Sequence, residues 1–142
     1  MYAPHYRLKS FEYLPETAKL GELGYLLEAL TAANVAYVLL RPETPTLYES
    51  GVRYQEEPPG RDEWQDIPDT IVRRVGDCED LACWRMADLR LGRAEAHEPN
   101  ARFFISSDDL PDGQGGTVHT FHIMIRRENG QIEDPSRRLG MP

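Results

Sequence analysis

The sequence predicts an α+β domain whose helices come first and whose antiparallel sheet follows. Apolar residues recur at helical spacing from Thr17 to Leu30 and again in CEDLACWRMADLRL, residues 78–91. Two later stretches, 101–106 and 118–127, are rich in the β-branched and aromatic residues that strands prefer. Because the helical and strand segments are separated along the chain, an α+β arrangement is favoured over alternating α/β units.

The composition favours one acidic, intracellular domain. The 142 residues suit a single domain over 1–142, with 1–15 as an irregular N-terminal arm. The net charge of −8 and the pI of about 5.0 argue against nucleic acid as a partner, because such binding relies on basic surface. The arginine pairs at 73–74, 126–127 and 137–138 are scattered, so we expect solvated faces or local ion pairs there.

The chain shows no targeting signal. We find no signal peptide and no apolar run of the roughly 18–20 residues that cross a bilayer. Cys78 and Cys83 are five positions apart, point in different directions on a helix, and are expected to be free thiols. We therefore expect a cytoplasmic protein without a membrane partner.

The first half of the chain predicts three helices and one long connection. The first helix begins near Thr17, and the apolar stretch 35–40 either extends it or forms a short strand. Residues 41–63 are rich in proline, glycine and charge, and long connections in compact domains are often functional. A short helix follows over 64–74, and Gly92 fits the C-cap of the helix after it.

The second half predicts strands joined by turns. Between the strands 101–106 and 118–127, the acidic, glycine-rich segment 107–117 predicts a mobile loop, which is a candidate lid. A turn at 128–130 then leads into a returning strand, QIEDPS, at 131–136. The sheet is therefore expected to be antiparallel.

Cys78 stands at a predicted helix start, directly after Gly76-Asp77 and before Glu79-Asp80. The thiolate is the nucleophilic form of cysteine, and the N–H groups and dipole at a helix start stabilise it and can form an oxyanion hole. The flanking acids oppose this, and a cation such as a protonated histidine would offset them. A lone free cysteine is more often a buried core residue, so a nucleophile requires a base elsewhere in the chain.

The candidate bases, His119 and His122, precede the predicted turn, and Asp134 follows it. A two-residue turn at 129–130 would place Asp134 opposite Ile125. His119 would then lie about 20 Å away along the strand, which is too far for contact.

A three-residue loop at 128–130 gives a different register. Asp134 then lies opposite Met124, one diagonal step of roughly 7–8 Å from His122. In this register His122 is the expected general base for Cys78, and Asp134 orients the imidazole and stabilises its charged form. His119 is kept as the alternative base.

This order of motifs resembles the transglutaminase-like branch of the papain-like cysteine enzymes. The family's pattern of Gly, any residue, Cys and then Ala four residues later is present as Gly76-Asp77-Cys78 and Ala82, and His122 and Asp134-Pro135 follow in order. GDCED, LYESGVRY and EDPSRRLGM are similar to phrases in small bacterial and phage transglutaminase-like cysteine proteinases. The resemblance implies a papain/transglutaminase-like core, with the catalytic cysteine at a helix N-terminus packed on an antiparallel sheet that carries His and Asp.

The oxyanion donors are less clear from the sequence. Many family members have an aromatic residue two positions after the histidine, where this chain has Met124. The backbone N–H of Cys78 is one expected donor. Gln55, Trp64 and Gln65 lie upstream with suitable N–H groups, although Trp64 also fits a plain core residue.

The resemblance also raises the question of calcium. In the calcium-dependent members, acids that flank the cysteine bind Ca²⁺, and Asp77, Glu79 and Asp80 occupy matching places. Calcium prefers several oxygen ligands and would relieve the charge around the thiol. Acids are also expected at a helix start without any metal, so we expect no cofactor and keep Ca²⁺ as the alternative.

These residues predict a cysteine hydrolase, a peptidase or amidase that acts through an acyl-enzyme on a peptide or isopeptide amide of a protein substrate. One alternative is a transglutaminase, which passes the acyl group to an amine. The other is a catalytically silent binding or assembly module of the same fold. Hydrolysis is favoured because water is the default acceptor and a short chain has little surface for a second, amine-binding site.

Overall fold

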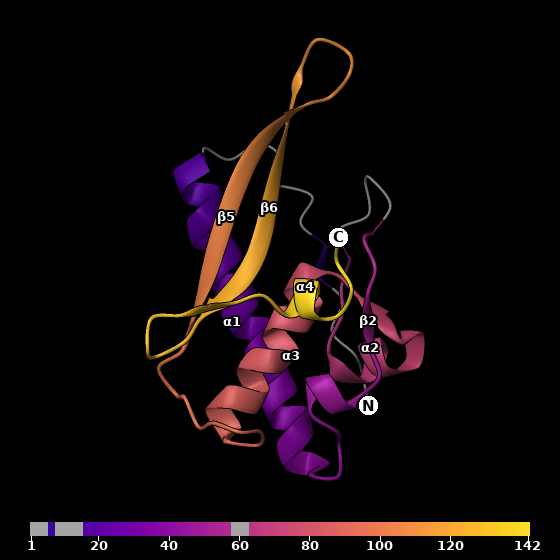
Figure 1. Ribbon diagram of the computed structural model, residues 1–142, viewed down its shortest axis with the longest axis vertical. Coiled ribbons are helices and arrows are strands. Elements are labelled where there is room, and N and C mark those ends of the chain that lie inside the picture. The colour runs from indigo at the N-terminus through magenta and orange to yellow at the C-terminus, as the bar shows by residue number, and fades with distance from the viewer. Residues whose placement is uncertain (1–5, 8–15, 58–62) are drawn as a thin grey trace.

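The computed structural model describes residues 6–7, 16–57 and 63–142 (Figure 1). The helices are α1 (Glu16–Leu40), α2 (Ile67–Arg73), α3 (Cys78–Leu91) and α4 (Pro135–Arg138), with a 3₁₀ turn η2 at Leu47–Glu49. The strands are β1 (Tyr6–Arg7), β2 (Arg53–Tyr54), β3 (Glu63–Trp64), β4 (Val75–Gly76), β5 (Arg102–Pro111), β6 (Thr117–Arg126) and β7 (Ile132–Glu133). The mixed α+β class predicted from the sequence is confirmed.

The main sheet is antiparallel, in the order β5-β6-β7. Two short pairs accompany it: β1 with β3, antiparallel, and β2 with β4, parallel. In the expected irregular arm, Tyr6–Arg7 is this paired strand β1, and the rest of the arm lies outside the described residues. The pairing of β2 with β4 brings Arg53–Tyr54, within the long connection, next to the residues that precede α3.

Helix α3 is the centre of the fold, because its residues from Asp80 to Leu89 are all buried. Two apolar clusters form around it. One cluster joins α3 to α1 and to the core face of β6, where Ile123 and Ile125 point inward. The other joins α3 to η2, α2 and the C-terminal segment through residues that include Leu47, Ile67 and Leu139. The N-terminus of α3 is thus held from both sides.

Helix α1 runs through residues 35–40, so this stretch extends the first helix rather than forming a strand. Leu20–Leu40 is long and apolar enough to cross a membrane, which corrects the statement that no such run exists. Small and polar residues interrupt this run, so it does not stand out in the sequence. Length and composition alone do not separate a membrane span from a core helix, and here Leu23, Leu27 and Leu30 are buried against α3.

The expected loop at 107–117 is wrong for most of its length. Strand β5 continues to Pro111 and pairs with β6 as far as Pro111↔Thr117, so only 112–116 forms the turn. Figure 1 shows this hairpin extending beyond the rest of the structure, so it does not form a lid there. The physical reason is that cross-strand pairing overrides the acidic, glycine-rich composition of the segment.

The returning strand is shorter than predicted. β7 ends at Glu133, and Asp134 caps α4 by accepting a hydrogen bond from the N–H of Arg137 at 3.2 Å. Pro135 stands at the first position of α4, where its missing N–H costs nothing. The chain therefore leaves the edge of β6 directly after Asp134.

Candidate active site

Cys78 is the first residue of α3, as predicted, and Gly92 is its C-cap with a positive φ of 66°. Cys78 is half-buried and Cys83 is buried, and both are free thiols. A Cβ added at Gly76 would lie 3.1 Å from Asp80 Cβ, so the close approach of β4 to the first turn of α3 favours glycine. These features fix the backbone around the thiol.

The three-residue hairpin loop is confirmed. The N–H of Arg127 donates to Gln131 O at 2.8 Å, and Gly130 has a φ of 89°. The register Ile125↔Glu133 then places Asp134 beyond the last pair. His122 Nε2 lies 2.7 Å from Asp134 Oδ2, so the sequence correctly predicted these two side chains as partners.

Cys78 lies at the same edge of β6 as the His122–Asp134 pair. The N–H groups of alternate residues point to the same edge of a strand. The N–H of Arg127 points toward the edge of β6 that pairs with β7, so the N–H of Ile123 points toward this edge too. Ile123 lies past the last residue pair of β6 with β7, so β7 does not cover its N–H. The backbone N–H of Ile123 hydrogen-bonds the Cys78 sulfur and favours the thiolate. The thiol therefore lies next to the backbone of His122.

The thiol is held in its protonated form by its surroundings. The Cys78 S–H donates to Glu79 Oε2 at 3.3 Å. Burial, followed by the charges of Glu79 and Asp77, raises the pKa of the Cys78 thiol well above its usual value. Burial and the charge of Asp80 raise the pKa of Glu79 to about 8. Among the described residues no hydrogen bond joins the thiol to His122.

The acids around Cys78 separate into two roles. Both oxygens of Asp80 point inward, where Oδ1 accepts the N–H of Gln65 at 2.7 Å and Oδ2 accepts that of Asp77 at 3.1 Å. In the expected calcium-binding set, Glu57 therefore replaces Asp80. The ligand atoms of Glu57, Asp77 and Glu79 lie within 4.8 Å of one another.

These three carboxylates form a donor set that could hold a hard divalent cation such as Ca²⁺. Asp77 Oδ1 is buried and has no hydrogen-bond partner in the described part of the chain. Burial, followed by the charge of Glu79, raises the pKa of Asp77 well above its usual range. Glu57 was missed from the sequence because only the pairing of β2 with β4 brings it to the helix start.

The candidate oxyanion donors are mostly engaged elsewhere. The Gln55 N–H donates to Gly76 O at 2.9 Å, and its side chain is exposed. Trp64 is 3% exposed and belongs to the core cluster, which confirms the prediction that it is a core residue. The Gln65 N–H is bound by Asp80. The N–H of Cys78 itself has no partner within residues 6–7, 16–57 and 63–142, so it is available to a ligand.

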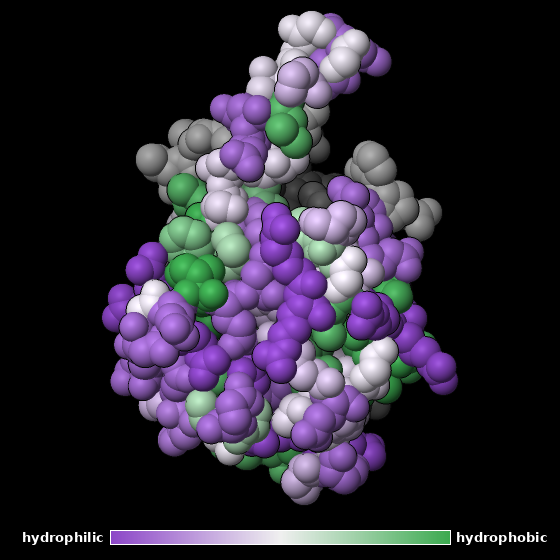
Figure 2. Space-filling view, in the orientation of Figure 1, coloured by the Kyte–Doolittle hydropathy of each residue, from purple (hydrophilic) through white to green (hydrophobic). Residues whose placement is uncertain are grey.

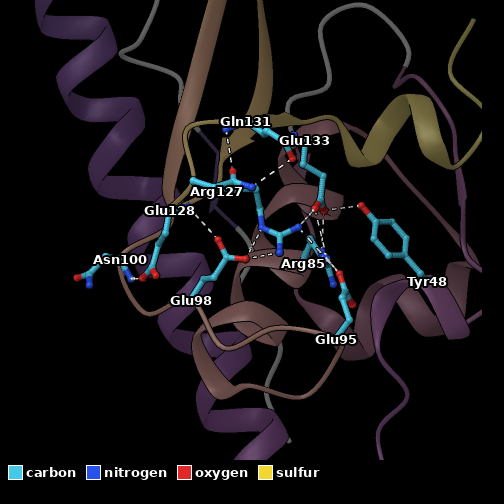
Figure 3. A network of polar contacts seen from close by, with 10 residues as sticks. Tyr48, Arg85, Glu95, Glu98, Asn100, Arg127, Glu128, Gln131 and Glu133 are labelled. Carbon is cyan, nitrogen blue, oxygen red and sulfur yellow. Dashed lines mark hydrogen bonds and ion pairs between the residues drawn. The ribbon is translucent and has the colours of Figure 1, made fainter.

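A partly buried ion network, which the sequence did not reveal, anchors β7 against α3 (Figure 3). Glu133 accepts from Arg85 Nε at 2.6 Å, from Tyr48 Oη at 2.7 Å and from Arg127 Nη1 at 2.6 Å. Burial alone would raise the pKa of Glu133, but the hydrogen bonds from Arg85 and Tyr48 lower it. Because Asp134 is the next residue, this network holds the partner of His122 in place.

A surface cavity lies away from the candidate site. The large surface cavity, about 570 Å³, is between α1 and β5 and is lined by residues that include Tyr25, Arg102 and Ile105, away from Cys78. Comparison of the chain with protein-family models, with curated proteins and with solved structures found no match. The chemistry of the residues around Cys78 is therefore the basis for assigning a function.

Proposed function

We propose that this protein is a cysteine hydrolase of the transglutaminase-like, papain-like type, which cleaves a peptide or isopeptide amide with Cys78, His122 and Asp134. The observation that carries the proposal is the 2.7 Å contact of His122 Nε2 with Asp134 Oδ2, at the edge of β6 where the Cys78 sulfur meets the Ile123 N–H. A binding module needs neither the paired imidazole nor a thiol beside it.

The pairing assigns the ring nitrogens. A carboxylate accepts hydrogen bonds, so Nε2 of His122 carries a hydrogen toward Asp134, and Nδ1 is the nitrogen left for proton transfer. Proton transfer in this proposal requires the Cys78 sulfur to leave Glu79 Oε2 and to reach Nδ1 of His122. Asp134 then stabilises the imidazolium that forms.

The chemical steps follow from these roles. His122 removes the thiol proton as the sulfur of Cys78 attacks the amide carbonyl, and the free N–H of Cys78 stabilises the oxyanion. The imidazolium gives its proton to the leaving amine, and the C–N bond breaks to leave a thioester. Water then attacks the thioester while His122 takes one proton of that water. The C–S bond breaks, His122 returns this proton to the sulfur, and the carboxylic acid and the free thiol are released.

The acids of the helix start regulate this chemistry in the proposal. A divalent cation held by Glu57, Asp77 and Glu79 would neutralise the carboxylates that disfavour the thiolate. In its absence Glu79 keeps the Cys78 proton in place.

Thiol reactivity tests the proposal directly. Native protein is treated with limiting iodoacetamide at neutral pH, with CaCl₂ or with EDTA, and Cys78 and Cys83 are quantified separately by peptide mass spectrometry. We expect faster alkylation of Cys78 than of buried Cys83, and slower alkylation in His122→Ala but not in the matched control His97→Ala. Equal, slow labelling of both thiols in every condition would refute the hydrolase.

Product analysis shows whether water or an amine accepts the acyl group from Cys78. A peptide library is incubated with wild-type protein and with Cys78→Ala, with and without a primary amine. Cleavage that requires Cys78 and no amine supports hydrolysis, whereas products that appear only with the amine indicate a transglutaminase.

A further inference from the structure

Four exposed arginines from three segments gather beside the proposed site, and we call them the arginine patch: Arg53, Arg74, Arg137 and Arg138. From the sequence, the pairs 73–74 and 137–138 were expected to be scattered. Figure 2 shows strongly hydrophilic side chains on this face over α4, to which the pair 137–138 belongs, and Arg74 follows directly after α2. The chain as a whole has a net charge of −8, so a local positive surface is distinctive.

Strand β2 brings the patch together. The Arg53 N–H donates to Arg74 O at 3.1 Å, and the Tyr54 N–H donates to Leu139 O at 2.9 Å on the other edge of the strand. Neighbouring strands lie about 4.8 Å apart, so Arg74, Arg53 and the segment directly after Arg138 form adjacent rows. The Arg53 side chain extends over this segment, because a Cβ added at Gly140 would lie 3.0 Å from its Nη2.

The charges of the patch are largely uncompensated. In the described part of the chain no carboxylate forms an ion pair with Arg53, Arg74 or Arg138. Arg138 instead stacks on Tyr48, with its guanidinium carbon 3.8 Å from the ring centroid. Stacked arginine keeps its hydrogen-bond donors available to a ligand. With respect to the carboxylates of residues 16–57 and 63–142, these three guanidinium groups can therefore bind an anion.

The patch is continuous with the proposed site. Arg137 Nε lies 3.5 Å from Asp134 Oδ2, the oxygen that contacts His122. Beyond Arg53, β2 continues through Tyr54, whose pKa is raised to about 12 by burial and by nearby acidic groups, including Cys78. The patch and the thiol therefore lie at opposite ends of one short strand.

We propose that the arginine patch binds a glutamate- or aspartate-rich segment of the peptide substrate, so that the residues next to this segment reach Cys78. This inference rests on the proposed function. Guanidinium groups pair with carboxylates in bidentate geometry, which suits an acidic peptide. The carboxylates of Glu57, Asp77 and Glu79 at the other end of the strand would repel a nucleic acid, which is charged at every unit. A peptide can be acidic at one end and neutral at the other.

Fluorescence anisotropy tests the inference without catalysis. A short fluorescein-labelled glutamate-rich peptide is titrated with the Cys78→Ala protein, with a glutamine-rich peptide of equal length as the uncharged comparison. The triple variant Arg53→Gln, Arg74→Gln, Arg138→Gln is made in this background. Its matched control removes the same charge elsewhere, at the exposed positions Arg41, Arg102 and Arg126.

We expect the acidic peptide to bind in preference to the uncharged one, with an affinity that falls with added salt. The patch variant should bind about tenfold more weakly, while the control should retain most of the affinity. Equal weakening in both triple variants would overturn the inference, as would tighter binding of a single-stranded oligonucleotide of equal charge. If the patch triple variant melts early, the single variants Arg53→Gln and Arg74→Gln take its place.

The two proposals fail in different ways. If the Cys78→Ala protein with its arginines intact does not prefer the acidic peptide, the arginine patch proposal is overturned and the thiol chemistry is unaffected. An inert Cys78 in the alkylation assay overturns the hydrolase, even where peptide binding by the Cys78→Ala protein persists.

Discussion

Replacing Glu79 with glutamine should lower the pKa of the Cys78 thiol and make it more reactive. The sulfur lies 3.3 Å from Glu79 Oε2, and glutamine keeps an oxygen acceptor there while removing the charge. Two unit charges at this distance repel by about 1.3 kcal/mol in water and by about 5 kcal/mol at an effective dielectric constant of about 20. Loss of this repulsion lowers the thiol pKa by roughly one to four units.

The rate of alkylation follows the thiolate fraction, so Glu79→Gln should raise the rate at Cys78 at least about tenfold. The effect should be largest above pH 8, where Glu79, with a pKa of about 8, is ionised in the wild type. The assay is limiting iodoacetamide across pH 6–10 with peptide mass spectrometry, Cys83 as the internal buried thiol and Glu43→Gln as the exposed control. Unchanged labelling of Cys78 at pH 9 would refute the electrostatic reasoning.

Four further results are expected. The pKa of Glu79 is higher in the folded state than in the unfolded state, so the folded state binds more protons between about pH 4.5 and 8. The free energy of unfolding therefore falls as the pH rises through this window. Thermal melts should show a smaller fall of the melting midpoint with pH in Glu79→Gln. Ca²⁺ should raise the melting midpoint, most at pH 8, and identical midpoints with Ca²⁺ and EDTA would contradict a cation site. Asp134→Asn keeps a good helix cap, so hydrolysis should slow at least about tenfold with an unchanged melt; a normal rate would exclude its role. Arg85→Ala leaves the half-buried Glu133 without its main partner and should cost about 2–3 kcal/mol in urea unfolding, against about 1 kcal/mol for Gly130→Ala at its positive φ.

Local patterns were sufficient for several features of the site. The helix start at Cys78 follows from the glycine, the acids and the apolar spacing that comes after them. The contact of His122 with Asp134 follows from the loop at 128–130, because turn length sets register and register sets which side chains share a face. These rules act over a few residues, so a single sequence contains them.

Local patterns gave wrong predictions for segments whose structure depends on strand pairing or on a helix start. The acidic residues of 107–111 predict a loop, yet they form strand β5 because β6 supplies a continuous partner. QIEDPS predicts a strand, yet it ends at Glu133 because Asp134 and Pro135 favour a helix start.

The sequence by itself determined the α+β class, the helix that begins at Cys78 and the pairing of His122 with Asp134. Only the tertiary structure decided which distant charges surround them. Glu57 reaches the carboxylates of Asp77 and Glu79, and Arg53 joins Arg74, through the pairing of β2 with β4, a contact across more than twenty residues. Periodicity and turn chemistry do not encode such neighbours. These contacts form only when the two apolar clusters pack around α3.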